Sequence, residues 1–206
     1  MIKNIVFDLG NVILEKDPMS VLEYMNLTNE EIKVFKESIF NEEIWKLKLD
    51  YGKMNLDEYY DVIKRDIPSS FREKGKNILL SINMYRKINE DVLMLIKKLY
   101  RNKYSIYILS DNNIDIYNYL KTTELNSYVS GFCISALYGA TKSDKKLFEI
   151  FFNEFHLNPS ECYFVDDNKL NIEIAREYGM IGFGLNWENN NLDDLINDMK
   201  QNKINI

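Results

Sequence analysis

The feature of this sequence that most constrains its fold is the regular alternation of short apolar runs with longer amphipathic stretches from residue 89 onward. Residues 89–103 place apolar side chains at helical spacing behind a capping residue, Asn89, and residues 104–110 form a short run rich in β-branched side chains. Strands that alternate with helices in this way pair in parallel, with helices on both faces of the sheet. We therefore expect an α/β fold with a Rossmann-like, doubly wound parallel sheet.

The same alternation continues to the end of the chain, and one further strand is expected near the N-terminus at residues 5–7. The other expected strands cover residues 131–137, 162–165 and 180–187. One expected helix carries an apolar stripe from Leu147 to Phe155, and two more cover residues 168–178 and 192–201. Gly179 marks the end of the helix at 168–178, because glycine is the residue that most often terminates a helix.

Residues 15–85 follow a different pattern, because they contain helical stretches without a convincing strand. Helices are expected at residues 18–26, 29–40, 42–49, 55–66 and 71–83. Pro18, Tyr51-Gly52 and Pro68 mark boundaries between them. We therefore predict two domains: an α/β core made of residues 1–14 and 86–206, and an all-helical cap of residues 15–85 inserted into it.

Composition excludes several classes of function. The net charge of −6 lacks the basic footprint that nucleic-acid binding requires. No uncharged apolar stretch approaches the roughly 20 residues of a membrane-spanning helix, and the N-terminal residues do not match a signal peptide. Cys133 and Cys162 are typical of reduced core residues, and His156 is typical of a helix end rather than a catalytic base. We expect a cytoplasmic protein with no nucleic-acid or membrane partner.

Polar residues stand at the carboxyl ends of the expected strands, and these ends meet at one edge of a parallel sheet. They are Asp8, Ser110, the Thr141-Lys142 loop and the Asp166-Asp167 pair. Three carboxylates would repel one another without a cation, and Mg²⁺ typically binds one or two carboxylates while leaving room for a phosphate. The hydroxyl and ammonium groups suit the remaining phosphate oxygens. The pattern indicates a phosphoryl-transfer site.

The chain resembles the haloacid dehalogenase (HAD) superfamily over nearly its whole length. The resemblance is carried by four motifs in order, "VFDLGNV", "ILSDN", "GATKSD" and "YFVDDNKLNIEIAREYGM". The "DLGNV" form, followed directly by a helical insert, is similar to the phosphatase-like branch with a small helical cap. Some members of that branch act on sugar phosphates. The resemblance implies a Mg²⁺-dependent phosphatase whose partner is a small phosphorylated metabolite.

The resemblance also implies roles for individual residues. Asp8 would be the nucleophile that forms an aspartyl-phosphate, and Lys142 would neutralise both Asp8 and the transferred charge. The phosphate-binding residues would be Ser110, Asp111, Asn112 and Lys142, and the Mg²⁺ ligands would be Asp8, the Gly10 backbone carbonyl, Asp166 and Asp167. Asp167 is favoured as a direct ligand, while Asp166 is either a second ligand or a water-mediated one.

Three positions depart from the family pattern. Most HAD phosphatases carry a general acid two residues after the nucleophile, where this chain has Gly10. The loss of general acid–base catalysis is commonly worth about 10²–10⁴-fold, so weakened activity is expected. Asp111 replaces the usual asparagine, and one arrangement has Asp111 turned away with Asn112 supplying the amide. Ser143 replaces the usual proline, which is expected to loosen the loop.

These departures leave an alternative function open, namely a catalytically weak or silent HAD-fold protein that binds a phosphorylated ligand or a protein partner. Hydrolytic dehalogenation is disfavoured by Asp166-Asp167, and a receiver-type signalling domain is disfavoured by the helical insert. Trp45 with Lys46 and Lys48 could bind a polar organic group, but burial preferences favour Trp45 as a core residue of the cap and the two lysines as solvated.

Overall fold

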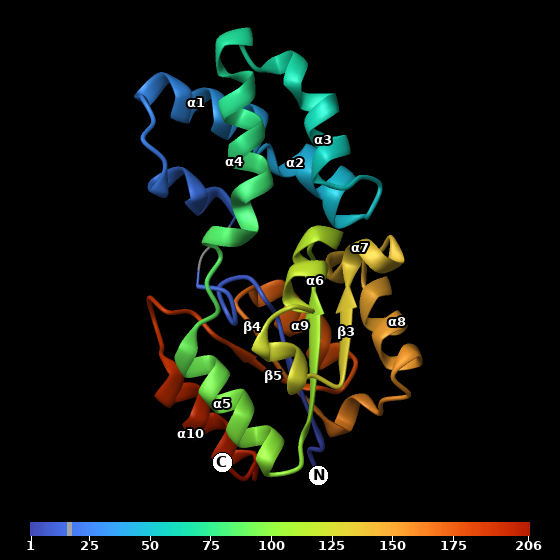
Figure 1. Cartoon of the computed structure of the whole chain (residues 1–206). Helices are drawn as coiled ribbons and strands as arrows, with labels where there is room; N and C mark the ends of the chain where they lie inside the picture. The colour runs from blue at the N-terminus through green and yellow to red at the C-terminus, as the bar shows by residue number, and fades with distance from the viewer. Residues whose placement is uncertain (16–17) are drawn as a thin grey trace.

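The computed structural model describes residues 1–15 and 18–206. Its core is one parallel sheet of five strands in the order β3-β2-β1-β4-β5 (Figure 1). The strands are β1 (Asn4–Phe7), β2 (Ser105–Ser110), β3 (Gly131–Ile134), β4 (Cys162–Asp166) and β5 (Ile181–Gly184). The predicted doubly wound fold is confirmed.

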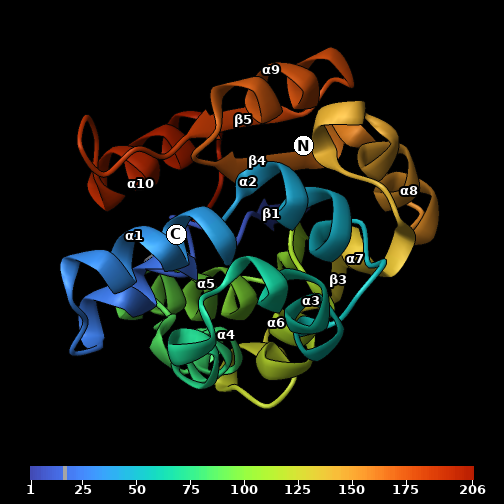
Figure 2. The same cartoon turned by 90° about the horizontal axis from the view of Figure 1, so that it is seen from above.

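Helices cover both faces of the sheet (Figure 2). One face packs against α5 (Glu90–Arg101), α6 (Ile114–Leu120) and α10 (Leu192–Gln201), and the other against α8 (Lys146–Glu154) and α9 (Lys169–Glu177). Successive side chains of β1 point to opposite faces of the sheet. Ile5 and Phe7 pack in the apolar cluster under α5, α6 and α10, and Val6 packs in the cluster under α8 and α9. A strand buried on both faces is apolar throughout, which explains the uninterrupted run at residues 5–7.

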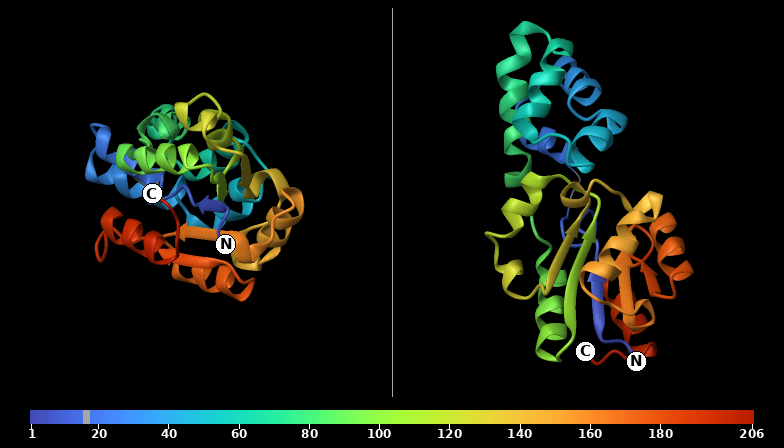
Figure 3. Two further views of the ribbon diagram at one scale, coloured as in Figure 1. Left: turned by 90° about the horizontal axis from the view of Figure 1, so that it is seen from below. Right: turned by 90° about the vertical axis from the view of Figure 1, so that its right-hand side faces the viewer.

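Residues 18–85 form helical elements, as predicted, and lie beyond the carboxyl ends of the strands (Figures 1 and 3). These elements are a 3₁₀ segment (Pro18–Tyr24), α1 (Asn29–Ser38), α2 (Glu42–Trp45), a π-helical turn (Lys46–Asp50), α3 (Leu56–Ile63), 3₁₀ turns at Lys64–Asp66 and Ser69–Phe71, and α4 (Arg72–Tyr85). They enclose an apolar cluster of their own around Phe35, Tyr59 and Leu79. We propose residues 15–85 as a cap domain on this basis, although residues 16–17 lie outside the described part of the chain.

The helix boundaries within the cap differ from those expected. Residues 18–24 adopt a 3₁₀ conformation and the helix expected at 42–49 divides at Trp45, where α2 passes into the π-helical turn. The helix expected at 55–66 ends at Ile63 and tightens into a 3₁₀ turn. The starts of α1 and α3 lie close to those predicted, because each helix has a capping residue before it. The side chains of Thr28 and Asn55 each accept a hydrogen bond from the backbone N–H of the third residue of the following helix.

The strand expected at residues 131–137 is shorter than predicted. It ends at Ile134, and α7 (Ser135–Tyr138) follows, ending at Gly139 in the left-handed conformation with φ 62°. The Ser135 hydroxyl accepts a hydrogen bond from the Asn112 backbone N–H (2.9 Å) and donates one to its carbonyl (3.1 Å), which turns the chain away from the strand direction. The apolar residues after Ile134 therefore belong to a helical turn.

The last strand is also shorter than the predicted range of 180–187, because it comprises Ile181–Gly184. The backbone N–H of Leu185 still reaches the carbonyl of Asp166 (3.0 Å), after which Trp187 turns toward the loop behind β1. Three further 3₁₀ turns lie at Glu124–Ser127, Lys142–Asp144 and Pro159–Glu161. Among the helices of residues 1–15 and 18–206, none combines the length and apolar character required to cross a bilayer.

Several polar contacts join the helical block to the core on the β3 side. The Lys46 ammonium donates to the Ser143 hydroxyl (2.9 Å), and the Tyr51 hydroxyl donates to Asp144 Oδ2 (3.0 Å). Gly52, at φ +65°, lies so close to α7 that a Cβ would be 1.9 Å from the Ala136 carbonyl oxygen. Only glycine permits this approach, so this loop is held firmly beside the core.

Candidate active site

Polar residues stand at the carboxyl ends of three adjacent strands, at one edge of the sheet. Asp8 directly follows β1, and its backbone N–H donates to the Val165 carbonyl of β4 (2.8 Å). Ser110 ends β2 and Asp166 ends β4. Because β1 lies between β2 and β4, these residues from distant parts of the sequence are neighbours, as the strand-end pattern predicts.

Lys142 joins this group from the loop behind α7. Its side chain is only 2% exposed, and its ammonium contacts Asp8 Oδ1 at 2.8 Å and Asp166 Oδ2 at 2.6 Å. Burial by itself would lower the pKa of Lys142, but the carboxylates of Asp166, Asp8 and Asp111 outweigh burial and raise it above its ordinary value. Lys142 is therefore a permanent positive charge between two carboxylates.

The third carboxylate completes a cluster suited to a divalent cation. Asp8, Asp166 and Asp167 each offer one oxygen, and these oxygens all lie within 4.8 Å of one another. Burial raises the pKa values of Asp166 and Asp167, while Lys142 opposes the rise for both. Hard carboxylate oxygens in this arrangement fit Mg²⁺, which would favour their ionised forms.

The hydrogen bonds around Asp166 and Asp167 differ. Both oxygens of Asp166 accept from the Asn171 amide at 3.1 Å, in addition to the Asn168 backbone N–H (2.8 Å) and Lys142. Asp167 Oδ2 accepts from the Asn11 amide at 3.0 Å. Asp166 is thus bound on both oxygens by protein donors, whereas the described side-chain contact of Asp167 uses only one oxygen.

Asn11 owes its position to two unusual features of the loop behind Asp8. Its backbone is left-handed with φ 52°, a conformation that asparagine tolerates better than most residues. The Trp187 indole donates to its carbonyl at 2.7 Å. The loop after the last strand therefore supports the loop after the first.

Asp111 and Asn112 line the opposite side of the site, while the buried Ser110 contacts Asn112 without lining the pocket itself. The Asn112 amide donates to the Ser110 hydroxyl at 3.2 Å, and Asp111 Oδ1 accepts from the Lys142 backbone N–H at 2.9 Å. Burial raises the pKa of Asp111, and Lys142 opposes the rise. Asp111 thus fixes the loop that carries Lys142, while Asn112 lies beside the hydroxyl proposed to bind phosphate.

Most of these groups line a pocket of about 270 Å³, although Ser110 and Asp166 do not, and its lining includes residues missed by sequence analysis. Its lining includes the core residues Asp8, Gly10, Asp111 and Lys142, and also Trp45, Asp50 and Arg86. Arg86 is 2% exposed and donates to the Asn112 amide oxygen at 3.1 Å. A Cβ built on Gly10 would lie 4.0 Å from the Arg86 guanidinium. No strand-end or motif signal marks either residue, because Asp50 is placed by the π-helical turn of the cap and Arg86 by the end of α4.

Asp50 is a half-buried carboxyl group at the end of the π-helical turn. Burial, followed by the nearby Asp111, raises the pKa of Asp50 to about 7, although Arg86, a hydrogen bond from the Trp45 side chain and Lys46 oppose the rise. Burial, followed by the charge of Asp50, also raises the pKa of Tyr59 in α3. An acid in this environment holds its proton close to neutrality.

Replacing Asp50 with asparagine is expected to stabilise the protein near pH 8 but not near pH 4. The folded chain keeps the Asp50 proton up to about pH 7, whereas the unfolded chain releases it near pH 3.8. Stability therefore falls as pH rises through this window, by at most about 4 kcal/mol from the gap between the two pKa values. Urea unfolding of both proteins at the two pH values measures the effect. An equal stability difference at both would contradict it.

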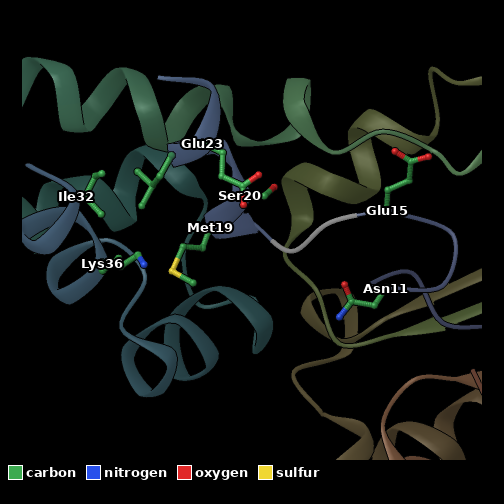
Figure 4. Close-up of a pocket in the computed structure, with 8 residues that line it drawn as sticks. Asn11, Glu15, Met19, Ser20, Glu23, Ile32 and Lys36 are labelled. Atoms are coloured by element: carbon green, nitrogen blue, oxygen red, sulfur yellow. The ribbon is translucent and has the colours of Figure 1, made fainter. Parts of the chain in front are cut away.

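Two other pockets adjoin the site on the side of the helical block. A pocket of about 370 Å³ shares Pro18, Trp45 and Asp50 with it and extends it toward Phe40 and Lys46. A pocket of about 400 Å³ lies between the loop of Asn11 and Glu15 and the cap residues Met19, Ile32 and Lys36 (Figure 4). The larger pocket lacks the strand-end carboxylates and Lys142, so its size does not make it the reactive centre.

The remaining sequence-based expectations concern residues outside this constellation. Cys133 and Cys162 are free and buried, and burial raises their thiol pKa values to about 12 and about 11. His156 follows the end of α8 with φ 52°, which confirms it as a helix-end residue. Trp45 packs on Phe40 and Tyr59 and also lines the pocket, so it is both a cap-core residue and a wall of the site.

Comparison with known proteins gives results consistent with this geometry. A family model described as haloacid dehalogenase-like hydrolase matches residues 2–179. A D-ribitol-5-phosphate phosphatase from Bacteroides thetaiotaomicron is 29% identical over an alignment 208 positions long, which covers 91% of this chain and 95% of the relative.

Solved structures share the fold at lower identity. A HAD family enzyme from Bacteroides thetaiotaomicron, in complex with magnesium and inorganic phosphate, is 23% identical with a TM-score of 0.71, covering 95% of this chain and 99% of that one. The L-2-haloacid dehalogenase from Xanthobacter autotrophicus is 15% identical with a TM-score of 0.63, covering 100% and 85%. Since the family model spans most of the sequence, this chain belongs to the haloacid dehalogenase-like hydrolase family.

Proposed function

We propose that this protein is a Mg²⁺-dependent phosphatase of a small phosphorylated metabolite, a sugar or polyol phosphate, and acts through an aspartyl-phosphate on Asp8. The observation that carries the proposal is the cluster of Asp8, Asp166 and Asp167 around the buried ammonium of Lys142. The activity named for the Bacteroides relative, D-ribitol-5-phosphate phosphatase, supports a polyol or sugar phosphate as the substrate class.

Each core residue has a role in this reaction. A carboxylate oxygen of Asp8 attacks phosphorus, and Lys142 balances the charge of Asp8 and of the transferred group. The Ser110 hydroxyl and the Asn112 amide bind phosphoryl oxygens. Asp8, Asp167 and the backbone carbonyl of Gly10 would hold Mg²⁺, which when bound neutralises charge on the phosphoryl oxygens.

The different surroundings of the two adjacent aspartates support unequal roles in metal binding. Asp166 accepts hydrogen bonds on both oxygens, so direct coordination would require it to exchange a protein donor for the metal. Asp167 has one oxygen that accepts from Asn11 and can offer the other. We therefore assign Asp167 as a direct ligand and Asp166 as a water-mediated one that also holds Lys142.

The organic part of the substrate would lie toward the cap. The adjoining pocket of about 370 Å³ continues from the site past Trp45 to Phe40 and Lys46. An aromatic wall with a neighbouring ammonium suits a short hydroxylated chain, since Trp45 offers an apolar face and Lys46 a hydrogen-bond donor. The limited size of both pockets favours a metabolite over a macromolecular substrate.

Phosphate release from ribitol 5-phosphate and related esters is expected to require Mg²⁺ and to respond unequally to the two aspartates. Asp167→Asn should raise the Mg²⁺ concentration for half-maximal activity by at least about tenfold, because Mg²⁺ sites use few protein carboxylates. Asp166→Asn should raise it less. Initial rates across a magnesium titration, with Asp115→Asn as a control aspartate outside the pocket, measure both effects. Undiminished activity in excess chelator would contradict the proposed function.

A further inference from the structure

We propose that Asp50 of the helical block protonates the leaving group, in place of the carboxylic acid that is absent at position 10. This inference rests on the proposed phosphatase function and assigns a catalytic residue to it. Gly10 offers no side chain, so an acid must reach the substrate from elsewhere or be missing altogether. Asp50 lines the same pocket as Asp8, Gly10 and Lys142, although it comes from the other domain.

The position of Asp50 matches the geometry of phosphoryl transfer. The attacking and leaving oxygens lie roughly in line on opposite sides of phosphorus. Asp8 attacks from the edge of the sheet, so the leaving oxygen departs away from the sheet. The helical block lies on that side, beyond the carboxyl ends of the strands (Figure 1). A proton donor on the cap is therefore placed where negative charge develops.

Contacts on both sides of Asp50 fix it over the site. Lys46, at the start of the same turn, binds Ser143 of the core, and Tyr51 binds Asp144. Gly52 then packs directly against the Ala136 carbonyl. A hydrogen bond from the Trp45 side chain orients the carboxyl group itself. These contacts hold the acid at the pocket without making it part of the core.

The other groups that face Asp50 cannot replace it as an acid. Arg86 lies beside Gly10, but a guanidinium does not release its proton at any ordinary pH. Lys142 is tied to Asp8 and Asp166, and Asp111 is tied to the Lys142 backbone. Lys46 is engaged with Ser143, and burial raises the pKa of Tyr59 beyond its ordinary range. Asp50, whose pKa is raised to about 7, suits an acid that works near neutrality.

Asp50 alone can supply and recover the proton in both steps, transfer of the phosphoryl group to Asp8 and hydrolysis of phospho-Asp8. In the first step Asp8 forms a bond to phosphorus, the bond to the leaving oxygen breaks, and that oxygen takes the electron pair and the Asp50 proton. The products are an alcohol, phospho-Asp8 and the Asp50 carboxylate. In the second step a water oxygen attacks phosphorus while Asp50 accepts its proton, and the bond to Asp8 breaks. Inorganic phosphate leaves, and both aspartates return to their starting forms.

The test compares an alkyl with an aryl phosphate ester, because only the alkyl ester leaves as a strongly basic oxygen that needs an acid. The probes are glycerol phosphate and p-nitrophenyl phosphate, and the readout is kcat/KM, which reports the steps up to departure of the leaving group. Asp50→Asn should lower kcat/KM for glycerol phosphate by about 10²–10⁴-fold and for p-nitrophenyl phosphate by less than about tenfold. Asp115→Asn, the same change at a cap–core contact outside the pocket, should alter neither.

Equal losses on both esters, or no loss on glycerol phosphate, would overturn the proposal. The wild-type protein supplies a test that does not depend on a folded variant. Across aryl and alkyl esters of rising leaving-group pKa, its kcat/KM should fall only shallowly, and a steep fall would mean that no acid assists departure. A wild-type protein that releases phosphate from none of these esters would instead overturn the proposed function, and this inference with it.

Discussion

Replacing Asp8 with asparagine is expected to lower phosphate release by at least about 10³-fold, with the fold intact, because the attacking oxygen becomes part of a non-nucleophilic amide. Asparagine is nearly the same shape as aspartate, and its amide oxygen can still accept the hydrogen bond that Lys142 donates at 2.8 Å. Steady-state rates on ribitol 5-phosphate measure the loss, and circular dichroism checks folding.

The same variant tests the covalent intermediate. Acid quenching of the wild-type reaction followed by peptide mass spectrometry should locate a phosphoryl group on Asp8, and the variant should carry none there. Asp115→Asn should retain both the rate and the phosphorylated Asp8. Residual activity of the Asp8→Asn protein above about a tenth of wild type would exclude Asp8 as the nucleophile, since a nucleophile normally contributes far more.

Replacing Lys142 with methionine is expected to damage both activity and stability. Without the ammonium, Asp8 and Asp166 remain buried together without the positive charge now 2.8 and 2.6 Å away, and breaking a buried ion pair in this way typically costs about 3–5 kcal/mol. Phosphate release should fall by at least about 10²-fold, because a preorganised charge at the transferred group is lost. Urea unfolding and steady-state rates measure the two effects.

A matched control for this variant is Lys64→Met. Lys64 pairs with Asp61 at 2.7 Å, but both side chains are about half or more exposed. Exposed pairs contribute roughly 0–1 kcal/mol, so this variant should unfold near the wild-type midpoint and retain activity. A Lys142→Met protein as stable as Lys64→Met would show that the buried carboxylates do not depend on the ammonium.

The elements predicted best are those whose signal is local. Each strand that ends on an acid was recognisable because a continuous apolar run stops at Asp8 or Asp166, and burial on both faces of the sheet produces that run. The strand predicted at 131–137 was too long because Ile134, Ala136 and Leu137 are all apolar, whether in a strand or a helical turn. The turn is set by hydrogen bonds between Ser135 and Asn112, which no local pattern reveals.

The core side of the site was predictable because the topology of a parallel sheet brings all its strand ends together. Asp8, Ser110, Lys142 and Asp166 needed only that rule and the four motifs. The cap side was not predictable in the same way. Asp50 belongs to a helical stretch whose π-helical turn decides where its side chain points, and Arg86 follows a long helix whose direction depends on packing within the cap.

The order of strands in the sheet has a consequence for how the protein forms during synthesis. Asn4 of β1 pairs with Ser105 of β2 and with Cys162 of β4, so β1 leaves the ribosome long before the strands with which it pairs. The helical block, which has its own apolar cluster, emerges in the meantime and can fold first. Because β4 leads directly into Asp166-Asp167, a nascent chain acquires its reactive centre only after β4 has emerged and paired with β1.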